Sequence, residues 1–457
     1  MVKISMIDGR IFKSIFAVLV IFAFIFSALN VYSATIKRKS ICTISTINNN
    51  KTTTLLSDTT LYVDDDAELG GDGSIEHPFK TVNEAIKHAK EGDTIFVFKG
   101  IYKENVMINK SYITLTGEDK ENTIIQYNSS QDSNFTIFIE GKHVKISNFT
   151  IKGAKKIGCI RVGTYSNVIN NIISDGSNGI LIQYIKGEGW KHHVNITKNI
   201  IRNNGIGIKV TCGRWSTTMY CHCVITDNVI TRNSKGILLD DTVKDVIQDN
   251  IISNNTECGI RMDDAHKDVI QDNIISNNPV GIQGVFAFHI KILYNQLFDN
   301  ANGVEFVYLL YSTIKGNNIS YNSNVGLYLQ TCGHNLIEGN NISHHQQGDA
   351  AGICLYYDDP AFHSGYNTVK GNNISYNKCG IDIYSSKHNT IKENKISYND
   401  VGITIEEALY NTYRLKKDNI FINNRRDIII GGIPFDQPIL KLFEAIVALF
   451  KRLFPYL

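Results

Sequence analysis

The sequence has no marked excess of charge of either sign. Its 46 Lys and Arg residues are balanced by 44 Asp and Glu residues, which leaves a formal net charge of +2. No basic run interleaved with aromatic side chains occurs, so the chain lacks the features of a nucleic-acid-binding protein. Nine cysteines are present without any C-x-x-C pair. The apolar run at 15–29 has 15 residues, which is short for a membrane-spanning helix.

The first 34 residues have the features of an export signal. Lys3, Arg10 and Lys13 precede the apolar run, and the small residue Ser33 follows it near a suitable cleavage point. We therefore expect an extracellular or cell-surface protein, with residues 1–34 acting as a cleaved signal or as a retained membrane anchor. The Ser-, Thr- and Asn-rich residues 35–60 predict a flexible linker.

A short phrase, N-x-I-x-x-N or a close variant, recurs from Asn170 to Asn424. Its first residue falls at Asn170, Asn199, Asn228, Asn250, Asn273, Asn295, Asn317, Asn340, Asn372, Asn394 and Asn419. The basic step is 22 or 23 residues, and longer steps carry inserted loops. A fixed period of this length indicates a solenoid, in which each repeat buries its apolar face against its neighbours.

Each repeat contains three strand-like phrases with β-branched residues at alternate positions, and no helical pattern. The Leu-rich phrase of leucine-rich repeats is absent. We therefore predict an all-β fold, a single-stranded right-handed parallel β-helix of about twelve coils at 143–430. The recurring Asn residues should form structural ladders at the corners, where their amides satisfy buried backbone groups.

The predicted β-helix has a capping element at each end. Residues 61–142 form an N-terminal cap and first coils, with a helix that starts at the capping box Thr81–Glu84 and ends at Gly92. Residues 431–457 form a C-terminal helix, strongly amphipathic over 438–457, which covers the last coil or lies on a membrane surface.

The N-terminal module resembles the start of pectate-lyase-like β-helix proteins. The resemblance rests on Tyr62-Val63-Asp64, Gly71-Asp72-Gly73-Ser74, Pro78-Phe79-Lys80-Thr81, Ala85-Ile86, Ala89, Gly92-Asp93-Thr94-Ile95, Gly100, Tyr102 and Glu104. The later repeats are similar to those of the NosD-like, carbohydrate-binding and sugar-hydrolase group. This resemblance implies the β-helix fold. It does not imply one activity, because the group includes lyases, hydrolases, epimerases, copper-site maturation proteins and proteins without activity. The paired N-x-D and G-H-G signatures of polygalacturonases are missing.

The third strand phrase of each repeat, G-I-x-I, points its two Ile side chains inward, so the second and fourth residues after the glycine face outward. On this face Asp240-Asp241 and Asp263-Asp264 lie one coil apart, with Arg261 nearby. Paired carboxylates are the groups that glycosidic cleavage needs. A solvated acidic surface or a Ca²⁺ site is the alternative interpretation.

The same face carries aromatic and polar residues on other coils that suit sugar rings. The predicted substrate-binding residues are Lys209, Glu305, Tyr308, Tyr328, Tyr356, Tyr357, Asp382 and Tyr384. Self-stacking of the tyrosines along the solenoid is the alternative. We expect inserted loops at 184–194, 212–223 and 344–366 to wall this face.

One inserted loop gathers Cys212, Cys221, His222 and Cys223. In a reducing compartment this set would be a metal site. In an exported chain, a disulfide from Cys212 to Cys221 or to Cys223 is the better prediction.

Three functions remain open from the sequence. The first is a monomeric protein that binds, and in one version cleaves, polysaccharide or cell-surface glycan. The second is a structural or adhesive spacer without chemistry. The third is NosD-like maturation of a copper site through the cysteine loop.

Overall fold

The structure is a computed structural model that describes residues 58–183, 193–212, 221–348, 350–357, 365–408, 415–431 and 433–434. These residues all belong to one unit, Leu56–Leu457. The predicted signal, most of the predicted linker and the C-terminal amphipathic helix lie outside the described residues. So do the central parts of three inserted loops, 184–192, 213–220 and 358–364.

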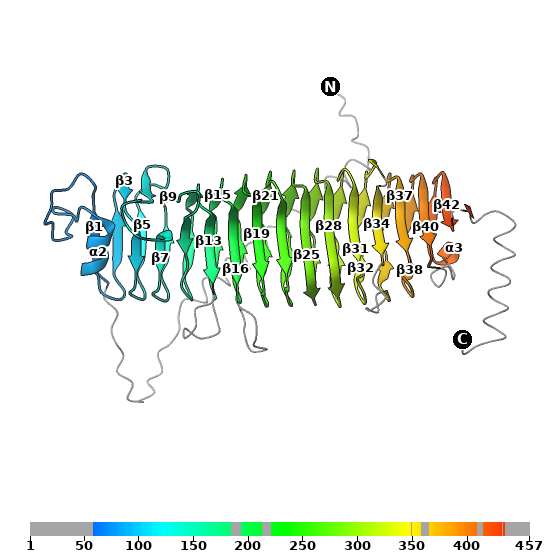
Figure 1. Ribbon diagram of the computed structural model, residues 1–457, viewed down its shortest axis with the longest axis horizontal. Coiled ribbons are helices and arrows are strands. Elements are labelled where there is room, and N and C mark those ends of the chain that lie inside the picture. Colours follow the sequence, from blue (N-terminus) through cyan, green and yellow to red (C-terminus); the bar gives the residue numbers. More distant parts are fainter. Residues whose placement is uncertain are drawn as a thin grey trace, which may run out of the picture. The chain divides into compact units, whose positions relative to one another are not determined.

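Nearly all described elements are strands, and they form three long sheets (Figure 1). Sheet 1 contains, in order, β1 (Thr60–Val63), β2 (Thr94–Val97), β5 (Thr114–Gly117), β8 (Lys145–Ser147), β11 (Asn167–Ile169), β14 (Asn195–Thr197), β17 (Val224–Thr226), β20 (Val246–Gln248), β23 (Val269–Gln271), β26 (Lys291–Leu293), β29 (Thr313–Lys315), β32 (Leu336–Glu338), β35 (Thr368–Lys370) and β38 (Thr390–Lys392).

Sheet 2 contains β3 (Gly100–Lys103), β6 (Thr123–Gln126), β9 (Thr150–Lys152), β12 (Ile172–Ser174), β15 (Ile200–Arg202), β18 (Val229–Thr231), β21 (Ile251–Ser253), β24 (Ile274–Ser276), β27 (Gln296–Phe298), β30 (Asn318–Ser320), β33 (Asn341–Ser343), β36 (Asn373–Ser375), β39 (Lys395–Ser397) and β41 (Ile420–Ile422).

Sheet 3 contains β4 (Val106–Ile108), β7 (Phe135–Ile139), β10 (Gly158–Arg161), β13 (Asn178–Gln183), β16 (Ile206–Thr211), β19 (Lys235–Asp240), β22 (Cys258–Asp263), β25 (Val280–Phe288), β28 (Asn302–Leu310), β31 (Val325–Gln330), β34 (Ala351–Tyr356), β37 (Cys379–Tyr384), β40 (Val401–Glu406), β42 (Arg426–Ile430) and β43 (Ile433–Pro434).

Through the repeats the chain visits sheets 1, 2 and 3 in turn, and each strand pairs in parallel with the equivalent strand of the next coil. The fold is therefore the predicted all-β right-handed parallel β-helix, with about 13 coils. Its interior is lined by aliphatic side chains in register. Ile252 pairs with Ile275, which pairs with Leu297 and then Ile319, and all four are fully buried. Stacking one apolar residue per strand on the next coil builds a continuous core.

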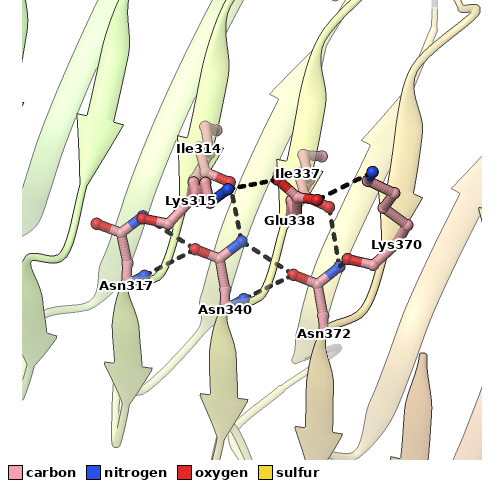
Figure 2. A network of polar contacts seen from close by, with 8 residues as sticks. All are labelled: Ile314, Lys315, Asn317, Ile337, Glu338, Asn340, Lys370 and Asn372. Carbon is pink, nitrogen blue, oxygen red and sulfur yellow. Dashed lines mark hydrogen bonds and ion pairs between the residues drawn. The ribbon is translucent and has the colours of Figure 1, made fainter. Parts of the chain in front are cut away.

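The buried asparagines form the predicted corner ladders. In one of them the side-chain oxygen of Asn340 accepts hydrogen bonds from the backbone N–H and the amide of Asn317, both at 2.9 Å, and Asn372 does the same for Asn340 (Figure 2). The amide of Asn340 also donates to the carbonyl of Ile314 at 2.9 Å. Each asparagine thus satisfies backbone groups that would otherwise be buried without partners.

The asparagine predicted to begin the first repeat needs a correction by one residue. Asn171, not Asn170, occupies this ladder and donates from its backbone N–H to Asn199 at 2.9 Å. Asn170 lies one residue earlier, at a corner position with a φ of 57°. The consecutive asparagines allow both alignments in the sequence, and only the stacking geometry distinguishes them.

The N-terminal cap contains the predicted helix, α2 (Val82–His88), which packs against β1, β2 and β4. Thr81 is its N-cap, and its hydroxyl accepts from the backbone N–H of Glu84 at 3.1 Å. The helix ends at His88, earlier than the predicted Gly92. The ammonium of Lys110 donates to the carbonyls of Ile86 and Ala89, and this contact from another element closes the helix early.

The only other helix among the described residues is α3 (Leu415–Asp418). Within the same residues, no helix combines the length and the hydrophobicity required to cross a bilayer.

Candidate functional site

The outer face of sheet 3 follows the predicted inward and outward alternation. In β19, Ile237 and Leu239 are completely buried, and Asp240 is half-exposed. Strand pairing places the outward residues of successive coils in two rows. The first row is Lys209, Leu238, Arg261, Gln283, Glu305, Tyr328, Cys354, Asp382 and Thr404. The second row is Thr211, Asp240, Asp263, Val285, Val307, Gln330 and Tyr356, followed by Tyr384 and Glu406.

Asp240 and Asp263 lie side by side in the second row, and each has a cation beside it. The ammonium of Lys209 lies 3.5 Å from Asp240, and Nε of Arg261 donates to Asp263 at 2.8 Å. This hydrogen bond raises the pKa of Arg261. The second carboxylate oxygen of Asp263 is buried and has no hydrogen-bond partner among the described residues.

Asp241 and Asp264 do not lie on the strand face with Asp240 and Asp263. They follow the ends of β19 and β22 in the left-handed conformation, with φ of 56° and 51°. Their backbone N–H groups donate to Asp263 and Val285 of the next coil. The four predicted catalytic acids are therefore divided between a strand row and a corner row, because the backbone turns between the two residues of each pair.

A hydrogen-bonded chain extends the first row along the rod. Arg261 donates to Gln283 at 2.8 Å, Gln283 donates to Glu305 at 3.3 Å, and Asn302 donates to the other oxygen of Glu305 at 2.7 Å. The next coil contributes Tyr328. Three consecutive coils are thus linked by polar side chains that offer both donors and acceptors at the surface.

The tyrosines on the following coils stack on one another. The ring centroids of Tyr328 and Tyr356 lie 6.4 Å apart, and those of Tyr356 and Tyr384 lie 5.3 Å apart, with interplanar angles of 22° and 17°. Self-stacking, the alternative considered above, therefore occurs, and the three tyrosines are half-buried. The nearby charge of Glu407 raises the pKa of Tyr384.

The remaining predicted substrate-binding residues lie around these rows. Tyr308 stacks on Phe286 at 4.8 Å, and both have positive φ within the last residues of β28 and β25. Tyr357 follows β34, and its backbone N–H donates to Tyr384. Asp382 pairs across the strands with Cys354 in the first row. The central parts of the loops expected to wall this face lie outside the described residues.

The cysteine cluster contains a disulfide between Cys212 and Cys221, whose Cα atoms are 6.2 Å apart. This is one of the two pairings expected from the sequence. Cys223 is a fully buried free thiol, and burial raises its pKa. The ring of His222 stacks on His193 at 5.0 Å.

The described residues contain one group of three acidic side chains close enough to share a metal ion, Asp64, Asp65 and Asp66. The expected Ca²⁺ position at Asp240, Asp241, Asp263 and Asp264 is not such a group within the described part of the chain. Lys209 and Arg261 already neutralise the two strand-face acids, so the donor set there does not fit a divalent cation.

Sequence reasoning missed a pair of buried carboxyl groups. Asp245 and Asp268 occupy one inner corner row and are completely buried. Asp268 accepts from the backbone N–H of Asp245 and from the hydroxyl of Thr242, both at 2.8 Å, and Asp245 accepts from the N–H of Cys223 at 2.7 Å. Burial raises the pKa of Asp268 to about 7, and burial together with the charge of Asp268 raises the pKa of Asp245 well above its usual range.

Comparisons with known proteins agree with this architecture. The family model "Periplasmic copper-binding protein (NosD)" matches residues 221–357 and 289–434. No curated protein sequence matches the chain. A solved structure of XylC with xylose aligns at a TM-score of 0.51 with 12% identity, covering 79% of this chain and 86% of that chain.

A second solved structure is the A-module of mannuronan C-5 epimerase AlgE4 from Azotobacter vinelandii. It aligns at a TM-score of 0.50 with 17% identity and covers 76% of this chain and 91% of that chain. At such low identity these similarities concern the fold. Together with the three parallel sheets, they show that the chain has the parallel β-helix fold, and residues 221–434 are similar to the NosD family model.

Proposed function

We propose that the protein binds polysaccharide along the outer face of sheet 3. The observation that carries this proposal is the pair of in-register rows, which run from Arg261 and Asp263 through Gln283 and Glu305 to the stacked tyrosines. Sugars present hydroxyl groups and apolar ring faces, and a strip of hydrogen-bonding side chains followed by aromatic rings suits both. Each coil adds a contact level, which fits a linear polymer lying along the rod.

Binding is favoured over cleavage by the partners of the acids. Glycoside hydrolysis needs two carboxyl groups that are free to act on the scissile bond. Asp240 and Asp263 are instead each engaged in an ion pair, with Lys209 and Arg261 respectively. We therefore assign these acids to glycan contacts and to fixing the positions of Lys209 and Arg261.

A location outside the cytoplasm is part of the proposal. The disulfide between Cys212 and Cys221 suits an oxidising compartment, and the matching family is described as periplasmic. The N-terminal signal expected from the sequence agrees with this location.

Copper binding, which the family's description mentions, is not extended to this chain. Cys212 and Cys221 are joined to each other, and the thiol of Cys223 is fully buried with a raised pKa. A thiolate is the form that binds metal ions, so the predicted cysteine site offers no ready ligand set.

Glycan-array binding by the purified full chain tests the proposal. We expect Tyr328→Ala combined with Tyr356→Ala to weaken binding about tenfold or more, because base or sugar stacking surfaces typically contribute 1–3 kcal/mol per ring. Tyr294→Ala is the matched control, since Tyr294 is 55% exposed at the corner between sheets 1 and 2, away from the face of sheet 3. Binding that survives the double substitution would place the glycan away from the outer face of sheet 3, and an array without any bound glycan would favour the spacer function.

A further inference from the structure

The corner between sheets 3 and 1 carries a continuous row of residues with positive φ, one per coil. We call this set the Tyr/His/Lys row. Its twelve members are Tyr112, His143, Tyr165, His193, His222, Lys244, Lys267, His289, Tyr311, His334, Tyr366 and His388. Where two neighbouring members have rings, the rings stack in parallel with centroids between 4.7 Å (Tyr112–His143) and 5.6 Å (His289–Tyr311) apart.

The fold itself does not require these residue types. The left-handed conformation favours Gly, Asn and Asp and costs other residues about 1 kcal/mol each. At the described corner between sheets 1 and 2, eight of eleven positive-φ residues are Asn, Asp or Gly. These eleven are Asn148, Asn170, Lys198, Asp227, Asp249, Asp272, Tyr294, Gly316, Gly339, Gly371 and Glu393.

The third corner shows the same tendency less strongly. Between sheets 2 and 3, seven of the twelve described residues with positive φ are Asn, Asp or Gly. The full set is Asp175, Asn203, Arg232, Asn254, Asn277, Asp299, Tyr321, His344, Gly348, Tyr376, Tyr398 and Asn423. None of the twelve members of the Tyr/His/Lys row is Asn, Asp or Gly, whereas Asp241 and Asp264 have positive φ at the sheet 3 end of the same corner. Identical backbone geometry with different composition indicates that something other than folding selects the side chains of this row.

The row presents donors to solvent at regular intervals. Its rings stack face to face along the row, and several of them are exposed. Tyr311 and Tyr366 are 54% and 51% exposed, and His289 and His334 between and beside them are also exposed. From His289 to His388, imidazole and phenol rungs alternate without interruption.

The charge of the row is never negative. Two of its members are lysines and six are histidines, and an imidazole ring becomes cationic when it takes up a proton. The neighbouring charged groups are also mostly basic, with Lys291 on β26, Lys387 before His388, and His266 before Lys267. The acids beside this part of the row are Asp241 and Asp264, whose charges act on the neighbouring His266, and the buried Asp245 and Asp268, which directly follow Lys244 and Lys267.

We propose that the Tyr/His/Lys row is a second binding surface, for a linear carboxylated polysaccharide, and that it binds more tightly on acidification. Imidazolium and ammonium groups pair with carboxylates, and the alternating phenols bond to the sugar hydroxyls between them. A single-file row with one donor every coil suits a linear chain better than a membrane surface, which has no repeat. The row lies on a different edge from the outer face of sheet 3, so this proposal does not depend on the function proposed above.

Binding of the full chain to polygalacturonate, with neutral dextran as comparison, tests the proposal at pH 5.5 and 7.5. We expect polygalacturonate to bind about tenfold or more tightly at pH 5.5, with the gain reduced by 0.5 M salt because it is electrostatic. The double variant His289→Asn and His334→Asn should lose most of that gain. Asparagine suits positive φ, so both substitutions are compatible with the backbone.

Two further double variants separate the role of this row from that of another corner and from that of the tyrosine hydroxyls. Tyr376→Asn with Tyr398→Asn, at the corner between sheets 2 and 3, alters two stacked rungs of similar exposure and should leave the acid gain intact. Tyr311→Phe with Tyr366→Phe keeps the stack and removes the hydroxyls, and should weaken binding about threefold to tenfold. Polygalacturonate binding that is pH-independent, unchanged in the histidine variant or equalled by dextran overturns the proposal, as does binding to phosphatidylglycerol vesicles without binding to the polymer.

Discussion

At the scale of single residues, the least expected feature is the pair of buried acids, Asp245 and Asp268. The same inner corner row contains neutral side chains in later coils, namely Ser312, Asn335, Asn367 and Asn389, which accept the same backbone hydrogen bond. Both acids belong to the repeated phrase D-V-I-Q-D-N, so the sequence alone suggests only a copied surface segment. Their burial is decided by the coil geometry, which a single repeat does not reveal.

Replacing both acids with asparagine should stabilise the protein at neutral pH. In the folded state the pKa of Asp268 is about 7, whereas an unfolded Asp titrates near 3.9. The folded chain therefore binds more protons between about pH 4 and 7, and the free energy of unfolding falls as the pH rises through this window and then levels off. The double variant should lack this loss and gain roughly 2–4 kcal/mol at pH 7.5.

Urea unfolding at pH 4.5 and pH 7.5 measures this effect. At pH 4.5 both acids are mostly protonated in the folded chain, so the variant and the parent should nearly coincide. Asn335→Asp is the matched control in the same row, and it should lower stability more at pH 7.5 than at pH 4.5. An equal effect of the asparagine variant at both pH values would contradict the raised pKa values of the two acids in the folded chain.

At the scale of elements, the sequence predicted the first residue of helix α2 better than its last residue. The capping box placed the start of α2 correctly because Thr81 and Glu84 are close in the chain. The end of the helix depends on Lys110, which comes from the segment after β4 and reaches three helix carbonyls. Glu104 likewise accepts from the backbone N–H groups of Val82 and Asn83 at the helix start. Such contacts across elements leave no local sequence signal.

Removing the ammonium of Lys110 should loosen the N-terminal cap. Lys110→Met keeps the aliphatic stem and leaves three carbonyls without their shared donor, so we expect a loss of about 1–3 kcal/mol. Lys395→Met, on the exposed start of β39, is the control and should change stability by less than about 0.5 kcal/mol. Thermal unfolding followed by circular dichroism compares the two, and equal melting temperatures for both variants would contradict the capping role of Lys110.

The disulfide offers a chemical test at the same scale. Peptide mapping of the unreduced, alkylated protein should recover Cys212 linked to Cys221, with Cys223 alkylated only after denaturation because its thiol is fully buried. A peptide that links Cys212 to Cys223 would contradict the pairing described here. The sequence narrowed the choice to these two pairings, and the positions of the flanking strands β16 and β17 decide between them.

At the scale of the whole molecule, most of the fold could be predicted from the 22- or 23-residue period of the sequence. Periodic Ile and Asn positions specify three sheets and their register, because each coil repeats the contacts of the last one. The outer rows of sheet 3 could also be read from the period. The partners within the rows could not, since the ion pair of Arg261 with Asp263 and the stacking of Tyr356 on Tyr384 depend on side-chain conformations.

The central claim is that a glycan lies along the outer face of sheet 3. Hydroxyl-radical footprinting of the full chain, with and without a glycan identified on the array, tests this most directly because tyrosine side chains report their own solvent exposure. We predict that the bound glycan protects Tyr328, Tyr356 and Tyr384, while Tyr294 on another corner keeps its reactivity. Protection of Tyr294 with unchanged reactivity of the three sheet 3 tyrosines would contradict the claim.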